Sequence, residues 1–136
     1  MGKIKVLVSW CENNYSAIAS GEYVGGTVIV TDKSLVGLKS RFKESMDFHL
    51  EGLKADGDEA PAALQGDYTL DFELTTQALL RSLDGKTTLT AIHRVTGINL
   101  KQLSHYSAGE KNPRPAQRAK IVNGIHHIAR DLATVV

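Results

Sequence analysis

The chain has few of the residues that mark specialised classes of protein. Among its 136 residues there are one cysteine, Cys11, three prolines and 6% aromatic residues. A single cysteine excludes an internal disulfide and therefore a secreted disulfide scaffold. No stretch approaches the roughly 18 consecutive apolar residues that a membrane helix needs, and the apolar run near the N-terminus alternates like a strand instead of resembling a signal-peptide core. We therefore expect a cytoplasmic protein with no membrane partner.

The composition that remains is that of an ordinary globular protein, but its charge is unevenly distributed. Hydrophobic residues make up 42% and charged residues 23%, which excludes disorder, collagen and a pure coiled coil as the main state. Residues 1–75 carry seven Lys/Arg against twelve Asp/Glu, a net charge of −5, whereas residues 76–136 carry nine against three, a net charge of +6. The total of +1 hides this difference, and the two halves are expected to have different partners.

The first half has strand patterns interrupted by one helical pattern. Apolar and polar residues alternate over three segments, β-branched residues fill a fourth, and apolar residues recur every three or four positions from Leu35 to Leu53. The four strand segments are residues 3–10, 15–20, 27–31 and 68–74. The helix begins after a cap at Asp32 or Ser34 and ends at Gly57, before a polar loop over residues 56–66. This order predicts a small β-β-β-α-β domain of the α+β class over residues 1–75.

The second half shows no strand pattern after Thr75 and is expected to be an all-α domain over residues 76–136. Three short helices are predicted over residues 77–83, 88–96 and 100–107. A longer amphipathic helix follows Pro115, with Ile121, Ile125, Ile128 and Leu132 on its apolar side.

The spacing within the second half predicts a helix-turn-helix. Gly97 stands where a tight turn needs a left-handed backbone, with Ile92 and Ile98 directed inward on either side of it. Leu103 and Tyr106 would pack the inner side of the second helix. The residues that suit base edges and phosphates are Asn99, Lys101, Gln102, Ser104, His105, Lys111 and Arg114. One departure is His93, at a position where a small residue is usual, and a plain helical bundle with a solvated charged face remains the alternative.

Four segments resemble a HicB-family antitoxin of the kind that carries a C-terminal Xre-like helix-turn-helix. They are NNYSAIASG, FKESMDFHLEGLKADG, DYTLDFEL and TGINLKQLSHYSAGEKNPRPAQR, and together they cover nearly the whole chain in order. The resemblance implies a degraded ribonuclease-H-like N-terminal domain that neutralises HicA, a small basic mRNA-cleaving toxin. It also implies a C-terminal domain that represses the operon, with residues 100–107 as recognition helix, and a homo-oligomer, dimeric or higher. The segment GEYVGG at residues 21–26 departs from the family because it lacks the proline-containing turn common there.

The acidic residues of the first half do not form the pattern of a nuclease. A ribonuclease-H enzyme needs several carboxylates that converge on paired metal ions. The first strand contains none, Glu12 lies beyond it, and Asp47 and Glu51 lie on the helix with no obvious strand partner. We therefore expect no enzyme activity, no metal and no cofactor.

The acidic residues around the last strand instead indicate a surface for a partner. Asp67, Asp71 and Glu73 alternate onto one side of the strand. They form either a solvated face or the site that pairs with Lys/Arg of a toxin, whose approach the net charge of −5 would accelerate.

Three functions are thus distinguished. The first is an antitoxin that also represses its operon. The second is a stand-alone helix-turn-helix transcription regulator whose N-terminal domain dimerises or senses a ligand. The third, which the carboxylate pattern disfavours, is a nuclease that would depend on Asp47 or Glu51.

Overall fold

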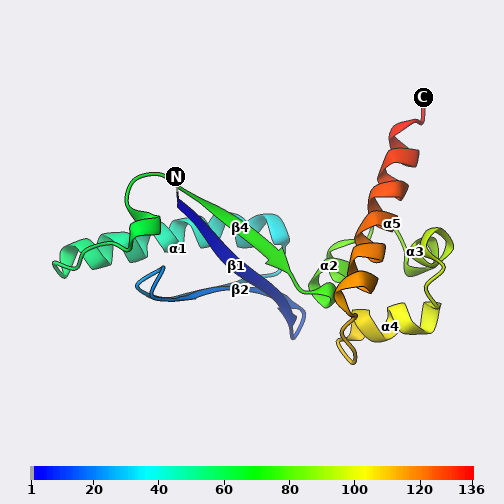
Figure 1. The fold of residues 1–136 in the computed structure, drawn as a ribbon, viewed down its shortest axis with the longest axis horizontal. Coiled ribbons are helices and arrows are strands. Elements are labelled where there is room, and N and C mark those ends of the chain that lie inside the picture. The colour runs from blue at the N-terminus through cyan, green and yellow to red at the C-terminus, as the bar shows by residue number, and fades with distance from the viewer. Residues whose placement is uncertain (1) are drawn as a thin grey trace. The chain divides into compact units, whose positions relative to one another are not determined.

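The computed structural model describes residues 2–136 and shows an α+β chain in which the strands precede most of the helices (Figure 1). It separates into two compact units, Met1–Thr75 and Thr76–Val136. The first holds a four-stranded mixed sheet and one long helix, and the second holds four helices.

The sheet of the first unit contains β1 (Gly2–Cys11), β2 (Asn14–Gly21), β3 (Gly26–Asp32) and β4 (Tyr68–Leu74) in the order β3-β2-β1-β4. The first three strands form an antiparallel meander, and β4 lies parallel to β1, with Gly2 opposite Tyr68 and Val8 opposite Leu74. Glu12 and Asn13 turn the first hairpin, both with positive φ, 48° and 70°. Positive φ at both central residues is typical of the two-residue turn whose twist suits a hairpin.

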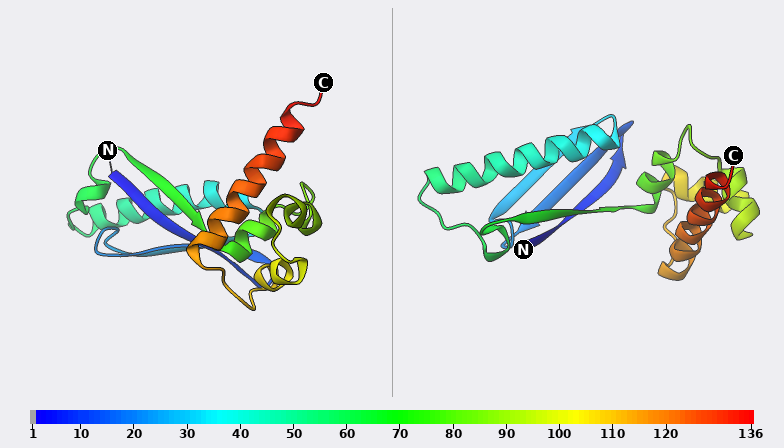
Figure 2. Two further views of the ribbon diagram at one scale, coloured as in Figure 1. Left: turned by 45° about the vertical axis from the view of Figure 1, so that its right-hand side comes forward. Right: turned by 90° about the horizontal axis from the view of Figure 1, so that it is seen from above.

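Helix α1 (Leu35–Ala55) covers one face of this sheet (Figure 2). The alternation predicted for the first strand is confirmed, because Ile4, Val6 and Val8 are fully buried. The buried residues of α1 are Leu38, Phe42 and Met46, as its three-and-four spacing predicts. Phe42 meets Phe72 of β4 edge to face, with ring centroids 5.9 Å apart. The alternate residues of the strands lie on the opposite face of the sheet, where Leu7 and Ile29 are exposed.

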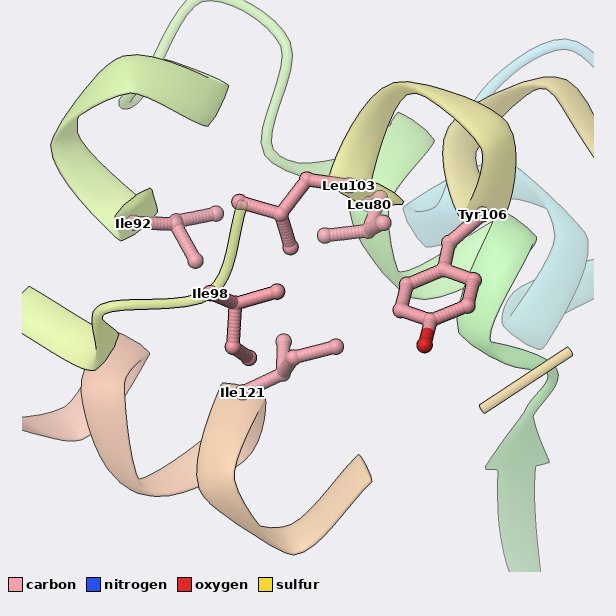
Figure 3. Close-up of a cluster of buried hydrophobic side chains, with 6 residues drawn as sticks. All are labelled: Leu80, Ile92, Ile98, Leu103, Tyr106 and Ile121. Carbon is pink, nitrogen blue, oxygen red and sulfur yellow. The ribbon is translucent and has the colours of Figure 1, made fainter. Parts of the chain in front are cut away.

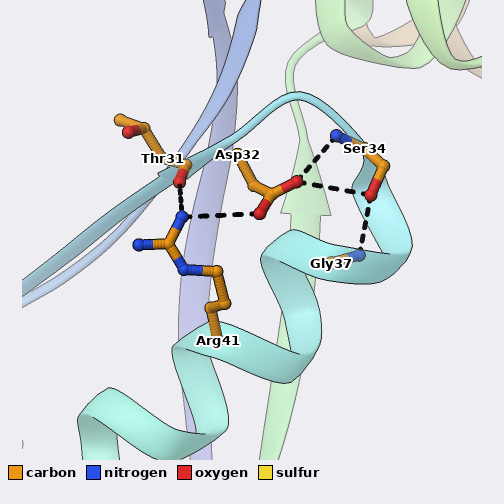
Figure 4. A network of polar contacts seen from close by, with 5 residues as sticks. All are labelled: Thr31, Asp32, Ser34, Gly37 and Arg41. Carbon is orange, nitrogen blue, oxygen red and sulfur yellow. Dashed lines mark hydrogen bonds and ion pairs between the residues drawn. The ribbon is translucent and has the colours of Figure 1, made fainter.

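The start of α1 is fixed by a network of polar contacts (Figure 4). Ser34 is the N-cap, and its Oγ accepts a hydrogen bond from the Gly37 amide at 3.0 Å. Asp32 Oδ1 in turn accepts from the Ser34 amide at 2.9 Å, and this bond lowers the pKa of the Asp32 carboxyl. Arg41, two turns into the helix, donates from Nη1 to the Thr31 carbonyl at 2.7 Å. The cap that the sequence left open between two residues is therefore Ser34, with Asp32 supporting it.

The connections of the first unit are more ordered than their polar composition predicts. The segment 56–66 contains a short 3₁₀ helix, η1 (Ala62–Leu64), whose Leu64 is buried. Between β2 and β3, Val24 is fully buried and its carbonyl is 2.7 Å from Nε2 of His49 on α1.

The second unit contains α2 (Thr76–Ser82), α3 (Leu89–Thr96), α4 (Leu100–Ala108) and α5 (Pro115–Ala133). All four helices contribute to one hydrophobic core, which Figure 3 shows. Its buried members are Leu80, Ile92, Ile98, Leu103, Tyr106 and Ile121. Ile125 and Ile128 pack against this core, but the prediction for Leu132 is wrong, because this residue is 61% exposed. The last turns of α5 extend past the short helices that cover its beginning.

None of the helices between residues 2 and 136 is both long and apolar enough to cross a membrane.

Candidate functional site

A tight turn joins α3 to α4. Gly97 ends α3 in the left-handed region, at φ 74° and ψ 3°, and its amide donates to the His93 carbonyl at 2.8 Å. The buried hydroxyl of Thr96 donates to the Ile92 carbonyl at 2.7 Å and accepts from the Ile98 amide at 3.1 Å. A Cβ on Gly97 would have open space around it, so the backbone conformation alone requires glycine.

His93, which stands where a small residue is usual, takes part in the same turn. Its Nδ1 lies 2.6 Å from the carbonyl oxygen of Ile98. A carbonyl can only accept, so Nδ1 carries the proton in this bond. The half-buried ring therefore closes the turn from the side, where a small residue would leave the Ile98 carbonyl without this donor.

Helix α4 begins with a side-chain cap and exposes part of its predicted contact set. Asn99 is the N-cap, and its Oδ1 accepts from the Lys101 amide at 2.8 Å. Lys101 and Ser104 are exposed, as the sequence predicts for residues that face outward. Leu103 is fully buried on the inner side of the helix. The cap fixes where α4 starts and thereby which of its residues face solvent.

The other two predicted contact residues of α4 are held partly against the protein. Gln102 donates from Nε2 to the Tyr106 hydroxyl at 2.8 Å and is half-buried. His105 is also half-buried, with Nε2 3.6 Å from Glu110 Oε2 and a buried Nδ1 that has no hydrogen-bond partner among the described residues. The expectation that both point fully outward is therefore only partly right.

Two surface hollows bring most of the predicted residues together. One is lined by Asn99, Lys101, Gln102, His105 and Lys111. The other is lined by Gln102, Tyr106, Lys111, Asn112, Arg114, Ala116 and Gln117. The hollows share Gln102 and Lys111, so they adjoin, and Ser104 lines neither. Four lining residues were not predicted as contacts: Tyr106, which was expected only to pack inward, and Asn112, Ala116 and Gln117. The signal that points to the last two is Pro115, which opens α5 and leaves the first amides of that helix without helical partners.

The three acidic residues expected on the partner surface are exposed. Asp71 and Glu73 lie on edge strand β4, and Asp67 lies immediately before it. Glu73 Oε2 is 3.2 Å from Nζ of Lys5 on β1, with both side chains at least half exposed. Because solvent screens such a pair, it contributes little stability and leaves Glu73 accessible to another cation.

Asp47 on α1 contacts strand β4, but through the hydroxyl of Tyr68 and not through a second carboxylate. Its Oδ1 accepts from the Tyr68 hydroxyl of β4 at 2.5 Å and from Lys43 Nζ at 3.0 Å. The bond from Tyr68, and then that from Lys43, lowers the pKa of the Asp47 carboxyl. Burial and the bond to Asp47 raise the pKa of the Tyr68 hydroxyl. This cluster links α1 to the sheet and uses the carboxylate as an acceptor.

The remaining acidic residues are dispersed. Glu12 lies in the β1–β2 turn and Glu51 is exposed on α1. Within residues 2–136, no three or more His, Cys, Asp and Glu side chains are grouped so that they could hold a metal ion.

Comparisons with protein-family models, with curated proteins and with solved structures gave no match to this chain.

Proposed function

We propose that the second unit binds DNA as a helix-turn-helix, with α4 as the helix that enters the major groove. The observation that carries this proposal is the turn at Gly97, which joins two short helices over a shared core. The left-handed glycine, the inward Ile92 and Ile98 and the capped start of α4 are the parts that such a motif needs. The alternative, a plain helical bundle with a solvated charged face, shares the same core, and the DNA-binding assay described below separates the two.

The charge of the second unit supports the same proposal. Its net charge of +6 would attract the phosphate backbone at long range. Lys101 lines the hollow at the start of α4, and Lys111 and Arg114 line the hollow at the start of α5. Helix N-termini favour phosphate because their first amides are unpaired. We assign base contacts to Lys101 and Gln102, and backbone contacts to Lys111 and Arg114.

We further propose that the chain is an antitoxin of the HicB kind, whose first unit covers the catalytic surface of a small basic RNA-cleaving toxin. Three features support this: the net charge of −5, the exposed acids at Asp67, Asp71 and Glu73, and a single sheet with one helix in the order expected of a degraded ribonuclease-H-like domain. Neutralisation would be steric. The second candidate, a stand-alone regulator, shares every feature of the second unit and differs only in having no toxin partner.

The DNA half is tested by a mobility-shift titration of the full chain against the DNA upstream of its own gene. Lys101→Ala is expected to weaken specific binding by about 1–3 kcal/mol. Arg114→Ala is expected to weaken binding to all sequences and to lower the slope of log K against log salt by about 1. Arg130→Ala is the matched control, because Arg130 is exposed on α5 and lines neither hollow. A folded protein that gives no shift at low salt refutes the proposal, as does an equal loss in the control.

The toxin half is tested by co-expression with the products of the adjacent genes. A toxin of about 60–90 residues, the size of one small domain, should copurify with the chain. Its ribonuclease activity should be lost in the complex. The triple variant Asp67→Asn, Asp71→Asn, Glu73→Gln should release the toxin while retaining the DNA shift, because the exchanged residues all lie in the first unit. Copurification of no small protein favours the stand-alone regulator. Loss of both activities in the triple variant refutes the separation into two functions.

A further inference from the structure

Edge strand β3 is unprotected against pairing with another strand. Most proteins place charges, prolines or bulges on an edge strand to prevent such pairing. Residues 27–31 of β3 read TVIVT, with high β-propensity and no charge or proline. Ile29 at the centre is 58% exposed. The other edge strand, β4, is protected by Asp71 and Glu73, so the two edges of the sheet differ sharply.

The main-chain groups of β3 are placed for a further strand. The two-residue turn pairs Cys11 with Asn14, so Asn14, Ser16 and Ile18 direct their main-chain groups towards β1. The alternate residues of β2 then face β3 and meet Val28, Val30 and Asp32. Thr27, Ile29 and Thr31 are left with their main-chain groups on the unpaired side.

Arg41 marks one end of this free edge. Its Nη1 reaches the Thr31 carbonyl at 2.7 Å, and it lies 3.4 Å from Asp32 Oδ2. A carbonyl oxygen has two lone pairs, so the Thr31 carbonyl can accept from Arg41 and from another strand together. The ion pair also offsets the one charge at this end of β3.

We infer that the partner of this edge is a second copy of the same chain, paired antiparallel about a two-fold axis at Ile29. This occupant is favoured because the free edge is a palindrome, TVIVT. In this register Ile29 meets Ile29 of the partner subunit, and Thr27 meets Thr31 of the partner subunit. Thr–Thr and aliphatic pairs of this kind are favourable across strands, and no charge meets a like charge. A symmetric dimer needs such a self-complementary patch.

The helix beside β3 adds apolar surface to the same interface. A groove runs along the unpaired side of β3 against α1, and its lining includes Ile29, Ser45 and Phe48. Phe48 is 76% exposed and so offers apolar surface to a partner at this groove. The two-fold axis would place the two copies of α1 antiparallel on one face of a continuous eight-stranded sheet. Phe48 would then be covered by the partner subunit.

This inference deepens the proposed function, since a helix-turn-helix protein reads a palindromic operator as a dimer. It does not depend on DNA binding, because self-association is measured without DNA. A chain that dimerises through β3 but shifts no DNA would refute the proposed function and leave the dimer intact. A chain that shifts DNA but does not pair through β3 would refute the dimer and leave the proposed function intact.

The first test is cross-linking through introduced cysteines in the full chain. In a Cys11→Ser background, Ile29→Cys should form an intermolecular disulfide on mild oxidation, because opposed residues of an antiparallel pair lie within disulfide reach. Leu7→Cys in the same background is the matched control. Leu7 is apolar, exposed on the same face and two strands in from the edge. Its two copies would lie about 24 Å apart, at about 4.8 Å per strand. Cross-linking of Leu7→Cys in place of Ile29→Cys would overturn the inference in favour of face-to-face docking.

The second test is sedimentation velocity of the wild type against Ile29→Lys, with Leu7→Lys as control. Ile29→Lys would oppose two ammonium groups on the axis and raise the Kd of self-association by about two orders of magnitude. The mass should fall by half, while the far-ultraviolet circular dichroism and the mass of Leu7→Lys stay as in the wild type. A monomeric wild type, or an unchanged mass for both Ile29→Lys and Phe48→Glu, would overturn the inference. Copurification of an extended segment of another protein at β3, lost in Ile29→Lys, would also overturn it.

Discussion

Gly124 on α5 lies close to the end of α3, next to the α3–α4 turn, and leaves no room for a larger residue. A Cβ at this position would lie 2.4 Å from Thr96 Cγ2 and 3.2 Å from Val95 Cγ2. Thr96 cannot yield without loss, because its hydroxyl bonds both the Ile92 carbonyl and the Ile98 amide. We therefore predict that Gly124→Ala disturbs the α3–α4 turn although the substitution lies on a different helix.

The expected loss of stability is the balance of two opposing effects. Replacing glycine by alanine within a helix normally stabilises by up to about 1 kcal/mol. Overpacking costs about 1–3 kcal/mol, and each weakened hydrogen bond of Thr96 costs about 0.5–1.5 kcal/mol. Because the overpacking and the weakened bonds together outweigh the gain in helix propensity, we expect Gly124→Ala to lower the free energy of unfolding of the second unit by about 1–3 kcal/mol. DNA affinity should fall with it.

Two further variants make this prediction specific. Thr96→Ser removes the methyl group that clashes but keeps the hydroxyl, so Gly124→Ala with Thr96→Ser should recover most of the stability lost by Gly124→Ala alone. Gly52→Ala is the matched control, because Gly52 lies on α1 and an added Cβ there would meet no atom within 4 Å. That substitution should be neutral or stabilising in the first unit.

The assay is hydrogen exchange of peptides covering residues 89–108, read beside urea unfolding of the full chain. Exchange resolves the opening of the second unit from that of the first. The predicted clash would be refuted if Gly124→Ala slowed hydrogen exchange in these peptides as much as Gly52→Ala slows it in α1. The clash would also be refuted if the double variant with Thr96→Ser were less stable than Gly124→Ala alone.

Two further predictions concern the first unit, where the Trp10 fluorescence reports unfolding. The folded-state pKa of Asp47 is lowered, so its contribution is fully present above the unfolded pKa and is lost as the pH falls through the folded one. Asp47→Asn should therefore lower stability at neutral pH by no more than about 1 kcal/mol, since its side chain is 52% exposed, and the difference should vanish in acid. A difference that persists below both pKa values would contradict this role. Asn13→Gly should stabilise the unit by about 0.5 kcal/mol because φ is 70° at this position, and Asn13→Val should destabilise it by about 1–2 kcal/mol. If the two variants unfold at the same urea concentration, the positive φ at this position contributes nothing to stability.

The features that the sequence predicted correctly are those set by neighbouring residues. Alternation predicted that Ile4, Val6 and Val8 lie on the buried face of the sheet, because successive side chains of a strand point to opposite faces. Asn99 caps α4 as predicted, Ser34 is one of the two residues predicted to cap α1, and Gly97 takes the left-handed conformation that a tight turn requires. Each of these signals lies within a few residues of the structure it determines, so it can be read without knowledge of the tertiary contacts.

The features that the sequence missed depend on contacts between distant residues. The bond between Asp47 and Tyr68 joins residues 21 positions apart, and only the packing of α1 on the sheet brings them together. Leu132 continues the apolar spacing of α5 but lies beyond the helices that cover its beginning, so periodicity alone cannot show that it is exposed.

The same distinction applies to the candidate sites. The residues of α4 and the following loop could be predicted as one group because they are contiguous, and one hollow brings together Asn99, Lys101, Gln102, His105 and Lys111. Ser104 belongs to the same predicted group but lines neither hollow. Asn112 and Gln117 were missed because their relevance comes from the direction in which α5 begins, which the fold decides. The palindrome at β3 needed both kinds of information. The letters TVIVT are visible in the sequence, but a palindrome within a central strand would be covered on both sides. It indicates self-association only because the strand order places β3 at an edge and leaves Ile29 exposed.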